Sequence, residues 1–271
     1  MKNRFALILI AAGACLACAT AANAGQRCDT AKPTPRVIER GLNLAQRTAA
    51  ALDAEHRQHG TRVVLLARAG QDLSKYGQHW SHVGWAYKTA EGPWRVVHKL
   101  NECGTDQSLI TRQGLGEFCL DDLWRYEAAW APPPPELQDA LWKLLQDNRR
   151  APALHQRRYS MVSYAWGTRY QQSNQWAIET LALAAEPQVQ RREQAQAWLR
   201  LKDYRAATLR IGALTRLGGR MTAGNVAFDD HPNAQRFADR IETVTADSVL
   251  DWLQRLSAGG AAPRVALLAG S

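Results

Sequence analysis

At residues 170–179 the sequence reads Tyr170-Gln171-Gln172-Ser173-Asn174-Gln175-Trp176-Ala177-Ile178-Glu179, and this stretch decides the fold. It puts a small polar residue at the start of an apolar helix. We expect Ser173 to be the N-cap, because a serine hydroxyl accepts hydrogen bonds from the free amides of a first helical turn. A plain capping serine is the simpler interpretation of the stretch alone. A nucleophile there would gain from the positive end of the helix dipole. The stripe expected to be buried behind it is Ile178, Leu181, Ala182 and Ala185.

The first 24 residues have the pattern of a secretory signal peptide. Lys2 and Arg4 precede an apolar run over residues 5–22, and Ala22-Asn23-Ala24 fits a small-x-small cleavage site. Cleavage near Ala24 would leave a mature chain from Gly25. No other apolar stretch is long enough to span a bilayer. We therefore expect an exported protein, periplasmic or secreted, with no stable transmembrane anchor.

Charge and composition narrow the partners. The chain carries 34 basic and 25 acidic residues, and removing Lys2 and Arg4 leaves the mature part at about +7. Such a balance favours anionic surroundings, such as cell-wall polymers, lipopolysaccharide or lipid head groups. Nucleic acid is not expected, because the arginines are scattered and the compartment is wrong for it. The predicted partner is a cell-envelope component: a peptide, a glycan or a lipid.

Cysteines are few, and their spacing does not suggest a metal site. Cys15 and Cys18 lie in the signal region, where they leave a lipoprotein signal as a minor alternative. Of the remaining three, we expect Cys28 to pair with Cys103 and tie the new N-terminus to the sheet, although three pairings are possible. Cys119 lies in an apolar stretch and is expected to be a buried small hydrophobe.

The mature chain predicts a single α+β domain over residues 25–258, followed by a flexible tail over 259–271. Strands alternate with turns in the first half, and the hairpin formed by residues 81–87 and 94–100 is the clearest pair. Residues 159–168 are aromatic and β-branched enough to be extended. Further expected strands are 63–67, 109–112, 123–130, 208–211 and 241–245; expected helices are 37–60, 136–147, 173–185, 189–202 and 247–256.

Two histidines fall on the predicted hairpin. Alternation puts His82 with residues 84 and 86 on one strand face, and His98 with residues 94 and 96 on the next strand. A base, an orienting group and a hydroxyl are the parts that nucleophilic catalysis requires, and His82, His98 and Ser173 supply them. A histidine in an apolar strand is nevertheless more often a satisfied core residue than a catalyst.

The other histidines are weaker candidates. His56 and His59 are spaced i, i+3 at a helix end, but no third metal ligand accompanies them, so we expect no metal and no cofactor. The cluster Asp229, Asp230 and His231 is interpreted as mostly structural, because Asp-Asp-His-Pro is also a loop with an Asx turn and a proline stop.

The order of these features resembles circularly permuted NlpC-type, papain-like hydrolases. The features are Ser81-His82-Val83-Gly84, a histidine about sixteen residues later, and a helix opened by Tyr170-x-x-Ser173-Asn174-x-Trp176. The mature chain also resembles a family of secreted bacterial proteins of unknown function. The stretches shared with that family are Gln-Gly-Leu, Asn174-Gln175-Trp176 and Asp230-His231-Pro232.

The resemblance implies a permuted papain-like fold in which His82 is the base, His98 the orienting residue and Ser173 the nucleophile. Those hydrolases use a cysteine, so serine is a departure: it stays protonated and must lose its proton during attack. The implied function is an amidase, peptidase or esterase, and the alternative is a non-catalytic binding protein that uses the same pocket. Groove and supporting residues are expected to be Tyr170, Asn174, Gln175, Trp176 and Trp85, with Trp166 as a further lining candidate.

Overall fold

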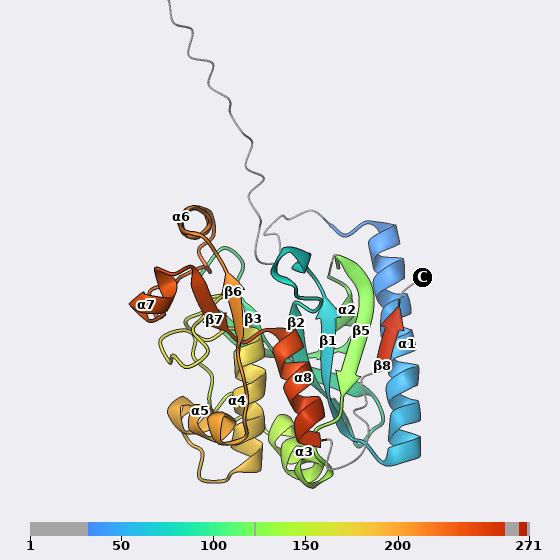
Figure 1. Cartoon of the computed structure of the whole chain (residues 1–271). Helices are drawn as coiled ribbons and strands as arrows, with labels where there is room; N and C mark the ends of the chain where they lie inside the picture. The colour runs from blue at the N-terminus through green and yellow to red at the C-terminus, as the bar shows by residue number, and fades with distance from the viewer. Residues whose placement is uncertain (1–31, 122, 258–265, 270–271) are drawn as a thin grey trace, which may run out of the picture.

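The computed structural model describes residues 32–121, 123–257 and 266–269. A six-stranded antiparallel sheet with the strand order β4-β3-β2-β1-β5-β8 forms its centre (Figure 1). A short ribbon, β6-β7, lies apart from the sheet. The strands are β1 (Val63–Ala69), β2 (His82–Lys88), β3 (Trp94–Asn101), β4 (Ser108–Gly114), β5 (Arg125–Ala131), β6 (Ala207–Arg210), β7 (Arg240–Thr243) and β8 (Ala266–Ala269).

Helices cover both faces of the sheet. On one face α1 and α2 close a core with alternate residues of β1, such as Val64 and Leu66. On the other face α3, α4 and α8 close a larger core with Val63 and Leu65. Because both faces of β1 are buried, its sequence is apolar at every position except Arg68 rather than alternating. The helices are α1 (Pro35–His59), α2 (Leu115–Cys119), α3 (Gln138–Gln146), α4 (Ser173–Ala185), α5 (Arg192–Leu201), α6 (Ala213–Thr222), α7 (Asn233–Arg236) and α8 (Ala246–Ser257).

Local signals fix the ends of α1. Thr34 is its N-cap and accepts from the amide of Val37, and Pro35 occupies the first turn, where its missing N–H costs nothing. Gly60 ends the helix in the left-handed conformation, with φ 68°. In the described part of the chain, no helix is long and apolar enough to cross a membrane.

The start of α4 differs from the expectation. Ser173 is the first helical residue and not the N-cap; Gln172 takes that role, and its side chain accepts from the amide of Asn174. Nor does α4 bury a single stripe. Every residue from Ser173 to Ala184 is buried, and of the predicted stripe only Ala185 is partly exposed. The helix is therefore the central helix of its layer, packed on several sides.

Residues 159–168 and the last described residues differ from the expectation. Residues 159–168 form turns, because their backbone groups bond to separate partners such as Asp106, Asn225 and Glu242 rather than along one strand; one isolated bridge joins Tyr164 to Thr243 at the end of β7. Within the predicted tail, Ala266–Ala269 is β8 and pairs with β5 at the edge of the sheet. The helices α2, α6 and α7 were not expected from the sequence. The other predicted strands and helices are present, with ends shifted by a few residues, and the α+β class with an antiparallel sheet packed by helices is confirmed.

Candidate functional site

The two predicted histidines form a hydrogen-bonded pair. His82 Nε2 lies 2.8 Å from His98 Nδ1, and His98 Nε2 lies 2.8 Å from Oε1 of Gln113 on β4. An amide oxygen only accepts, so His98 must donate through Nε2 and accept at Nδ1. His82 must then donate through Nε2. Its Nδ1 keeps a lone pair and has no hydrogen-bond partner among the described residues.

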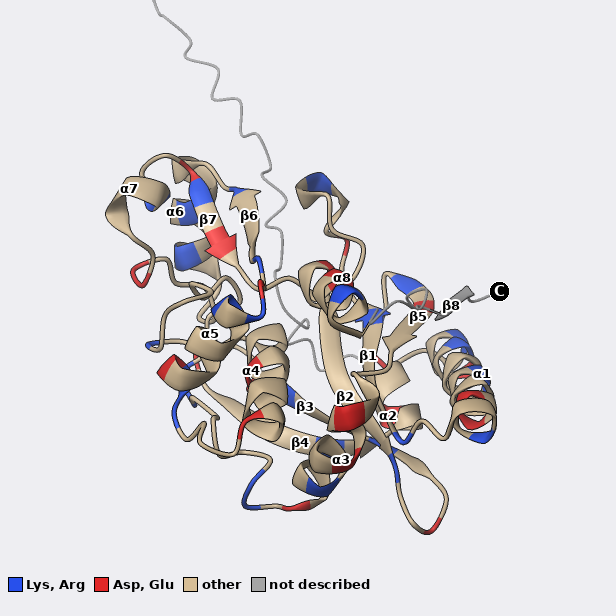
Figure 2. Cartoon of the chain, turned by 60° about the horizontal axis from the view of Figure 1, so that its bottom comes forward, with Lys and Arg blue, Asp and Glu red and all other residues tan. Residues whose placement is uncertain are grey.

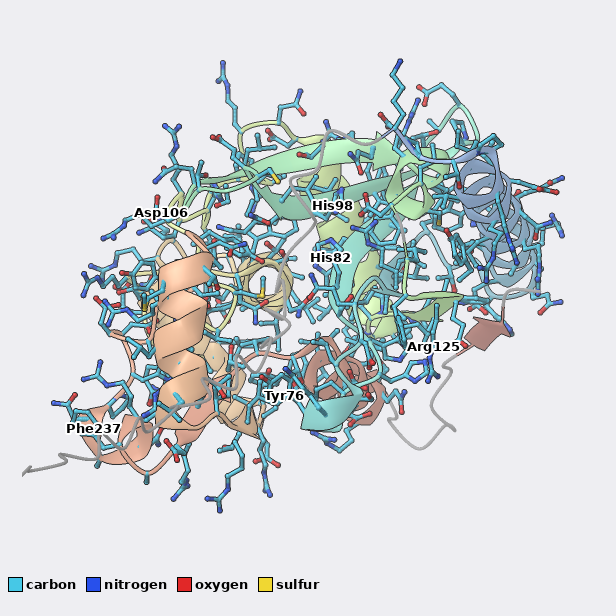
Figure 3. All side chains as sticks on the ribbon, turned by 90° about the horizontal axis from the view of Figure 1, so that it is seen from above. Tyr76, His82, His98, Asp106, Arg125 and Phe237 are labelled. Carbon is cyan, nitrogen blue, oxygen red and sulfur yellow. The ribbon has the colours of Figure 1, made fainter. Side chains whose placement is uncertain are left out.

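Strand geometry explains why the rings meet. Gly84 on β2 lies against β3, where an added Cβ would come within 2.9 Å of His98 Cβ and 2.7 Å of Val96 Cγ1. The missing side chain lets β2 and β3 approach closely at this point. Figure 3 shows both rings next to each other near the centre of the molecule. His98 is buried, whereas His82 is only partly buried and remains accessible to solvent.

Phe118 and Arg68 enclose the pair. The Phe118 ring lies 5.9 Å from the His82 ring and 5.3 Å from the His98 ring, measured between centroids. Arg68 is held beside them by Asp121 and by a 2.5 Å bond to the carbonyl of Phe118. Burial, and then the Arg68 charge, lower the pKa of His98 to about 3 and the pKa of His82 well below 6.5. Both rings are therefore neutral at neutral pH, which is the state that a general base requires.

Ser173, at the start of α4, lies near the same end of β2 as His82. However, α4 packs on the face of the sheet opposite to α2 and the histidine pair. The ladder between β2 and β3 runs only to the pair Trp85–Val97, and the amide of Val83 beyond it donates to Oδ1 of Asn174, 3.0 Å away. His82 and Ser173 are the sequence neighbours of these two residues. In the described structure, however, no hydrogen bond joins the Ser173 hydroxyl to either imidazole.

The hydroxyl of Ser173 is bonded instead to the hydroxyl of Tyr159, with 3.3 Å between the oxygens. Both residues are buried. Burial raises the pKa of Tyr159 above 10, although hydrogen bonds from Ser173 oppose the shift, so the phenol stays protonated and can donate. Tyr159 is thus the hydrogen-bond partner of the predicted nucleophile.

The predicted supporting residues mostly build the core. Trp85 and Trp176 are fully buried, and the Trp85 indole donates to the carbonyl of Ala177 at 2.9 Å, so neither lines a groove. Gln175 anchors the turn before the helix, donating to the carbonyls of Tyr164 and Ala165. Asn174 is the exception, since it links α4 directly to β2. Tyr170 is buried between the guanidinium groups of Arg158 and Arg169, and Trp166 is partly buried and donates to Glu242.

The acidic cluster has a structural role in the same turn region. Asp230 accepts from the amide of Tyr164 at 2.8 Å, and His231 donates from Nε2 to the carbonyl of Val162 at 2.8 Å. Asp229 pairs with Arg169. These bonds hold the turn that precedes α4. Among the described residues, no group of three or more His, Cys, Asp or Glu side chains could hold a metal.

A buried network of polar side chains joins α4 to α5 and to β3. Arg192 forms a two-pronged ion pair with buried Glu179, at 2.7 and 3.0 Å, and Gln171 donates to the same carboxylate at 2.6 Å. Lys99 donates to Gln171 and is completely buried. Burial, together with the Arg192 charge, lowers the pKa of Lys99 to about 6. These bonds connect α4 and the residue Gln171 before it to β3 through Lys99 and to α5 through Arg192.

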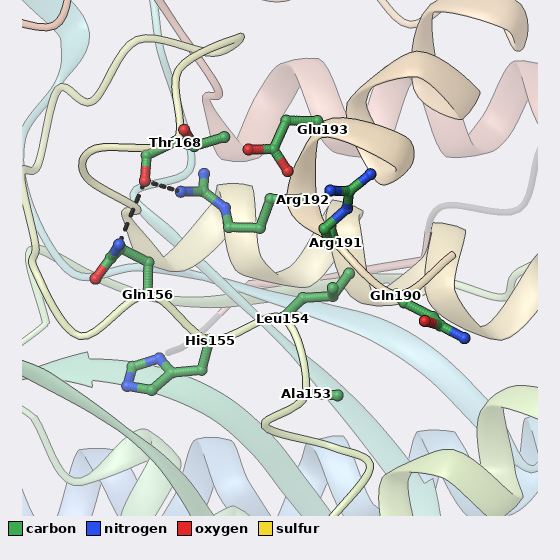
Figure 4. Close-up of a pocket in the computed structure, with 9 residues that line it drawn as sticks. All are labelled: Ala153, Leu154, His155, Gln156, Thr168, Gln190, Arg191, Arg192 and Glu193. Atoms are coloured by element: carbon green, nitrogen blue, oxygen red, sulfur yellow. Dashed lines mark hydrogen bonds between the residues drawn. The ribbon is translucent and has the colours of Figure 1, made fainter. Parts of the chain in front are cut away.

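An open pocket of about 330 Å³ lies beside this network (Figure 4). Arg192 and Gln156 both donate to the carbonyl of Thr168 at its wall. The pocket does not include Ser173, His82 or His98. Its lining consists of Ala153, Leu154, His155, Gln156, Thr168, Gln190, Arg191, Arg192 and Glu193.

The cysteines meet their expectation in part. Cys119 is a free, buried thiol, and burial raises its pKa to about 12. Cys103 is disulfide-bonded. Its predicted partner, Cys28, lies outside the described residues, so the pairing itself stays a prediction.

Sequence reasoning missed four residues of the histidine site. Gln113 and Phe118 lie in or next to the Gln-Gly-Leu stretch, which was noticed only as a shared pattern. Arg68 is the one charged residue in the apolar strand β1, and a charge in a buried strand was the signal that could have indicated a site there. Tyr159 gave no local signal, because its contact with Ser173 depends on how the turns fold.

Comparison with known proteins identifies a family. Residues 55–253 match DUF2145, described as an uncharacterized protein conserved in bacteria. No curated protein and no solved structure matches the chain.

Proposed function

We propose that this chain, which belongs to the DUF2145 family, is an exported hydrolase of amide or ester bonds with a permuted papain-like fold. The observation that carries the proposal is the relay from His82 through His98 to Gln113. It fixes one tautomer on each ring and leaves His82 Nδ1 free as a base. The NlpC-type resemblance assigns the same two histidines to the base and to its orienting partner.

The low pKa values of the histidines favour a hydroxyl nucleophile. A cysteine hydrolase works best with a thiolate beside an imidazolium, and Arg68 with burial opposes a protonated His82. A serine starts from a neutral imidazole, which is the form that this environment favours. The same burial and Arg68 charge oppose the imidazolium that forms while the proton is transferred.

The proposed reaction has two steps. The Ser173 oxygen attacks the substrate carbonyl carbon while its proton passes to His82 Nδ1 through a bridging water, because no direct hydrogen bond joins the two side chains in the described structure. The leaving amine or alcohol departs with that proton, and the acyl group remains on Ser173. Water then attacks the acyl carbonyl, His82 takes its proton, and Ser173 is released. In this proposal the Tyr159 hydroxyl, which is bonded to the Ser173 hydroxyl, would donate to the oxyanion.

Substrates are proposed from the predicted compartment and charge. A basic exported protein meets cell-wall peptides and acylated envelope components, and both contain amide or ester bonds. The direct test is hydrolysis of a panel of acyl-peptides and acyl esters by the wild type, Ser173→Ala and His82→Gln. Activity lost in both variants supports the proposal. Hydrolysis unchanged in both variants would contradict it.

A second candidate is a binding protein without catalysis. It is favoured by the Ser173 hydroxyl, which is buried and bonded to Tyr159 rather than to His82. Such a protein would bind an envelope peptide or glycan at the surface beside the partly buried His82. Equal binding of cell-wall fragments by the wild type and Ser173→Ala, without turnover of any panel substrate, would favour this candidate.

A further inference from the structure

The helix α6 has a fully exposed apolar face. None of its residues is buried, and Leu214, Leu217 and Met221 are 86%, 57% and 78% exposed. Their spacing of three and four residues places them on one side of the helix. Phe237, directly after α7, is 72% exposed. Four large apolar side chains on one small subdomain are more than isolated surface exposure explains.

The opposite side of α6 is the one that packs on the protein. Arg216 points inward, where it pairs with Asp239 at 2.5 Å and donates to the carbonyl of Ile211. Gly219 also faces inward, since a Cβ there would meet Val226 at 3.4 Å. Gly218 lies among the apolar side chains, and a Cβ there would meet nothing within 4 Å. The apolar face therefore points away from the molecule.

Positive charge flanks this face. Between Asp203 and Asp229 the chain contains no acidic residue and four arginines: Arg205, Arg210, Arg216 and Arg220. Arg210 and Arg220 are exposed, as is Arg240 on the neighbouring β7. Figure 2 shows the basic positions gathered around α6, β6 and β7. An apolar stripe bordered by arginines is the pattern of helices that lie in the interface of an anionic membrane.

We propose that α6 binds a membrane surface rich in anionic lipid, lying in the plane of the head groups. In this arrangement Leu214, Leu217, Met221 and Phe237 enter the boundary between head groups and acyl chains, and Arg210, Arg220 and Arg240 contact phosphate groups. A second copy of this chain is the poorer partner, because a two-fold contact through this face would bring like arginine clusters together. The surface is separate from the histidine site, so this proposal does not depend on the proposed function.

Vesicle sedimentation of the purified mature chain tests the proposal. We expect binding to vesicles that contain phosphatidylglycerol, little binding to pure phosphatidylcholine, and weaker binding as salt is raised. Leu214→Ser together with Met221→Ser should lower the affinity by about tenfold or more, since both side chains lose apolar contact. Leu201→Ser is the matched control, because Leu201 is 80% exposed on α5, outside the α6 surface.

A fluorescent label locates the contact. Gly218→Cys can carry an environment-sensitive dye in the middle of the apolar face, while Cys119 is buried and does not compete for it. The dye should shift to the blue with phosphatidylglycerol vesicles, and the same dye on Leu201→Cys should not. Absence of vesicle binding would overturn the proposal. So would binding that the double variant leaves unchanged, or a lipid-free dimer that the double variant dissociates.

Discussion

His82 Nε2 lies 2.8 Å from His98 Nδ1, across two strands that Gly84 allows to approach closely. Gln113 accepts from the far nitrogen of His98, so the direction of every proton in the relay is set. The outcome is a partly exposed, neutral imidazole with one free nitrogen. The proposed chemistry depends on this arrangement more than on any other contact.

Gln113 should be a positioning residue. In Gln113→Leu the Nε2–H of His98 loses its acceptor, so the tautomer that supports His82 is no longer fixed. We expect kcat to fall by about tenfold to a hundredfold, within the usual contribution of general-base catalysis, with KM little changed. Gln113→Glu should raise the pKa of the histidine pair and move the rising limb of the pH–rate profile to higher pH.

Thr111→Val is the control for these variants. Thr111 is the direct cross-strand partner of His98, but its buried hydroxyl has no hydrogen-bond partner. Its rate and pH profile should match the wild type. An equal loss in Gln113→Leu and Thr111→Val would mean that the strand packing, and not the relay, controls the rate.

Gly84→Ala should damage both stability and the site. The added Cβ would lie 2.7 Å from Val96 Cγ1 and 2.9 Å from His98 Cβ, so the strands must move apart. We expect a loss of about 1–3 kcal/mol in the free energy of unfolding, measured by urea denaturation. Gly218→Ala on α6 has open space and should be neutral or stabilising, by up to about 1 kcal/mol. A neutral Gly84→Ala would contradict the close approach.

His98 should make stability depend on pH. Its pKa is about 3 when folded, against 6.5 for an ordinary histidine, so the unfolded chain binds more protons between these values. Its contribution is fully present above pH 6.5 and is lost as the pH falls toward 3, by at most about 1.4 kcal/mol per pH unit. His98→Gln should flatten the wild-type slope in this range, whereas changing the exposed His59 at the end of α1 to Gln should preserve it.

Ser173→Cys tests whether residue 173 is a reactive position, with the helix start rather than a protonated His82 favouring the thiolate, because Arg68 and burial oppose an imidazolium there. A cysteine in the first turn of a long helix tends to ionise more easily, whereas Cys119 has its pKa raised to about 12 by burial. Iodoacetamide should therefore modify the variant far faster than the wild type, in which Cys119 is the free thiol of the described residues. If residue 173 is only structural, the new thiol should be as inert as Cys119.

The sequence predicted the central sheet well because its strands are strong local patterns. The apolar run at β1 and the aromatic and β-branched residues of β2 and β3 define strands without help from distant residues. The ends of the chain were harder. Ala266–Ala269 is a strand only because β5 offers it an edge, and α6 has too little burial to leave a core signature.

The site was predicted as a set of residues but not as a geometry. His82 and His98 do meet, as alternation on adjacent strands allowed, but the register that joins them was not derivable. Ser173 was expected as an N-cap, and Gln172 took that role because its longer side chain also reaches Val244 and Thr243. Trp85 and Trp176 were expected in a groove, yet their size makes them core residues in a layer that α4 fills completely.

The most direct test of the account is covalent labelling of the mature protein with a fluorophosphonate, followed by peptide mapping. We predict one label per chain, on Ser173, formed by the wild type and by His79→Gln but not by His82→Gln. His79 is the control because its ring pairs with Glu127 and takes no part in the relay. Labelling of Ser173 that is unaffected by His82→Gln, or no labelling of Ser173 in the folded wild type, would contradict the account.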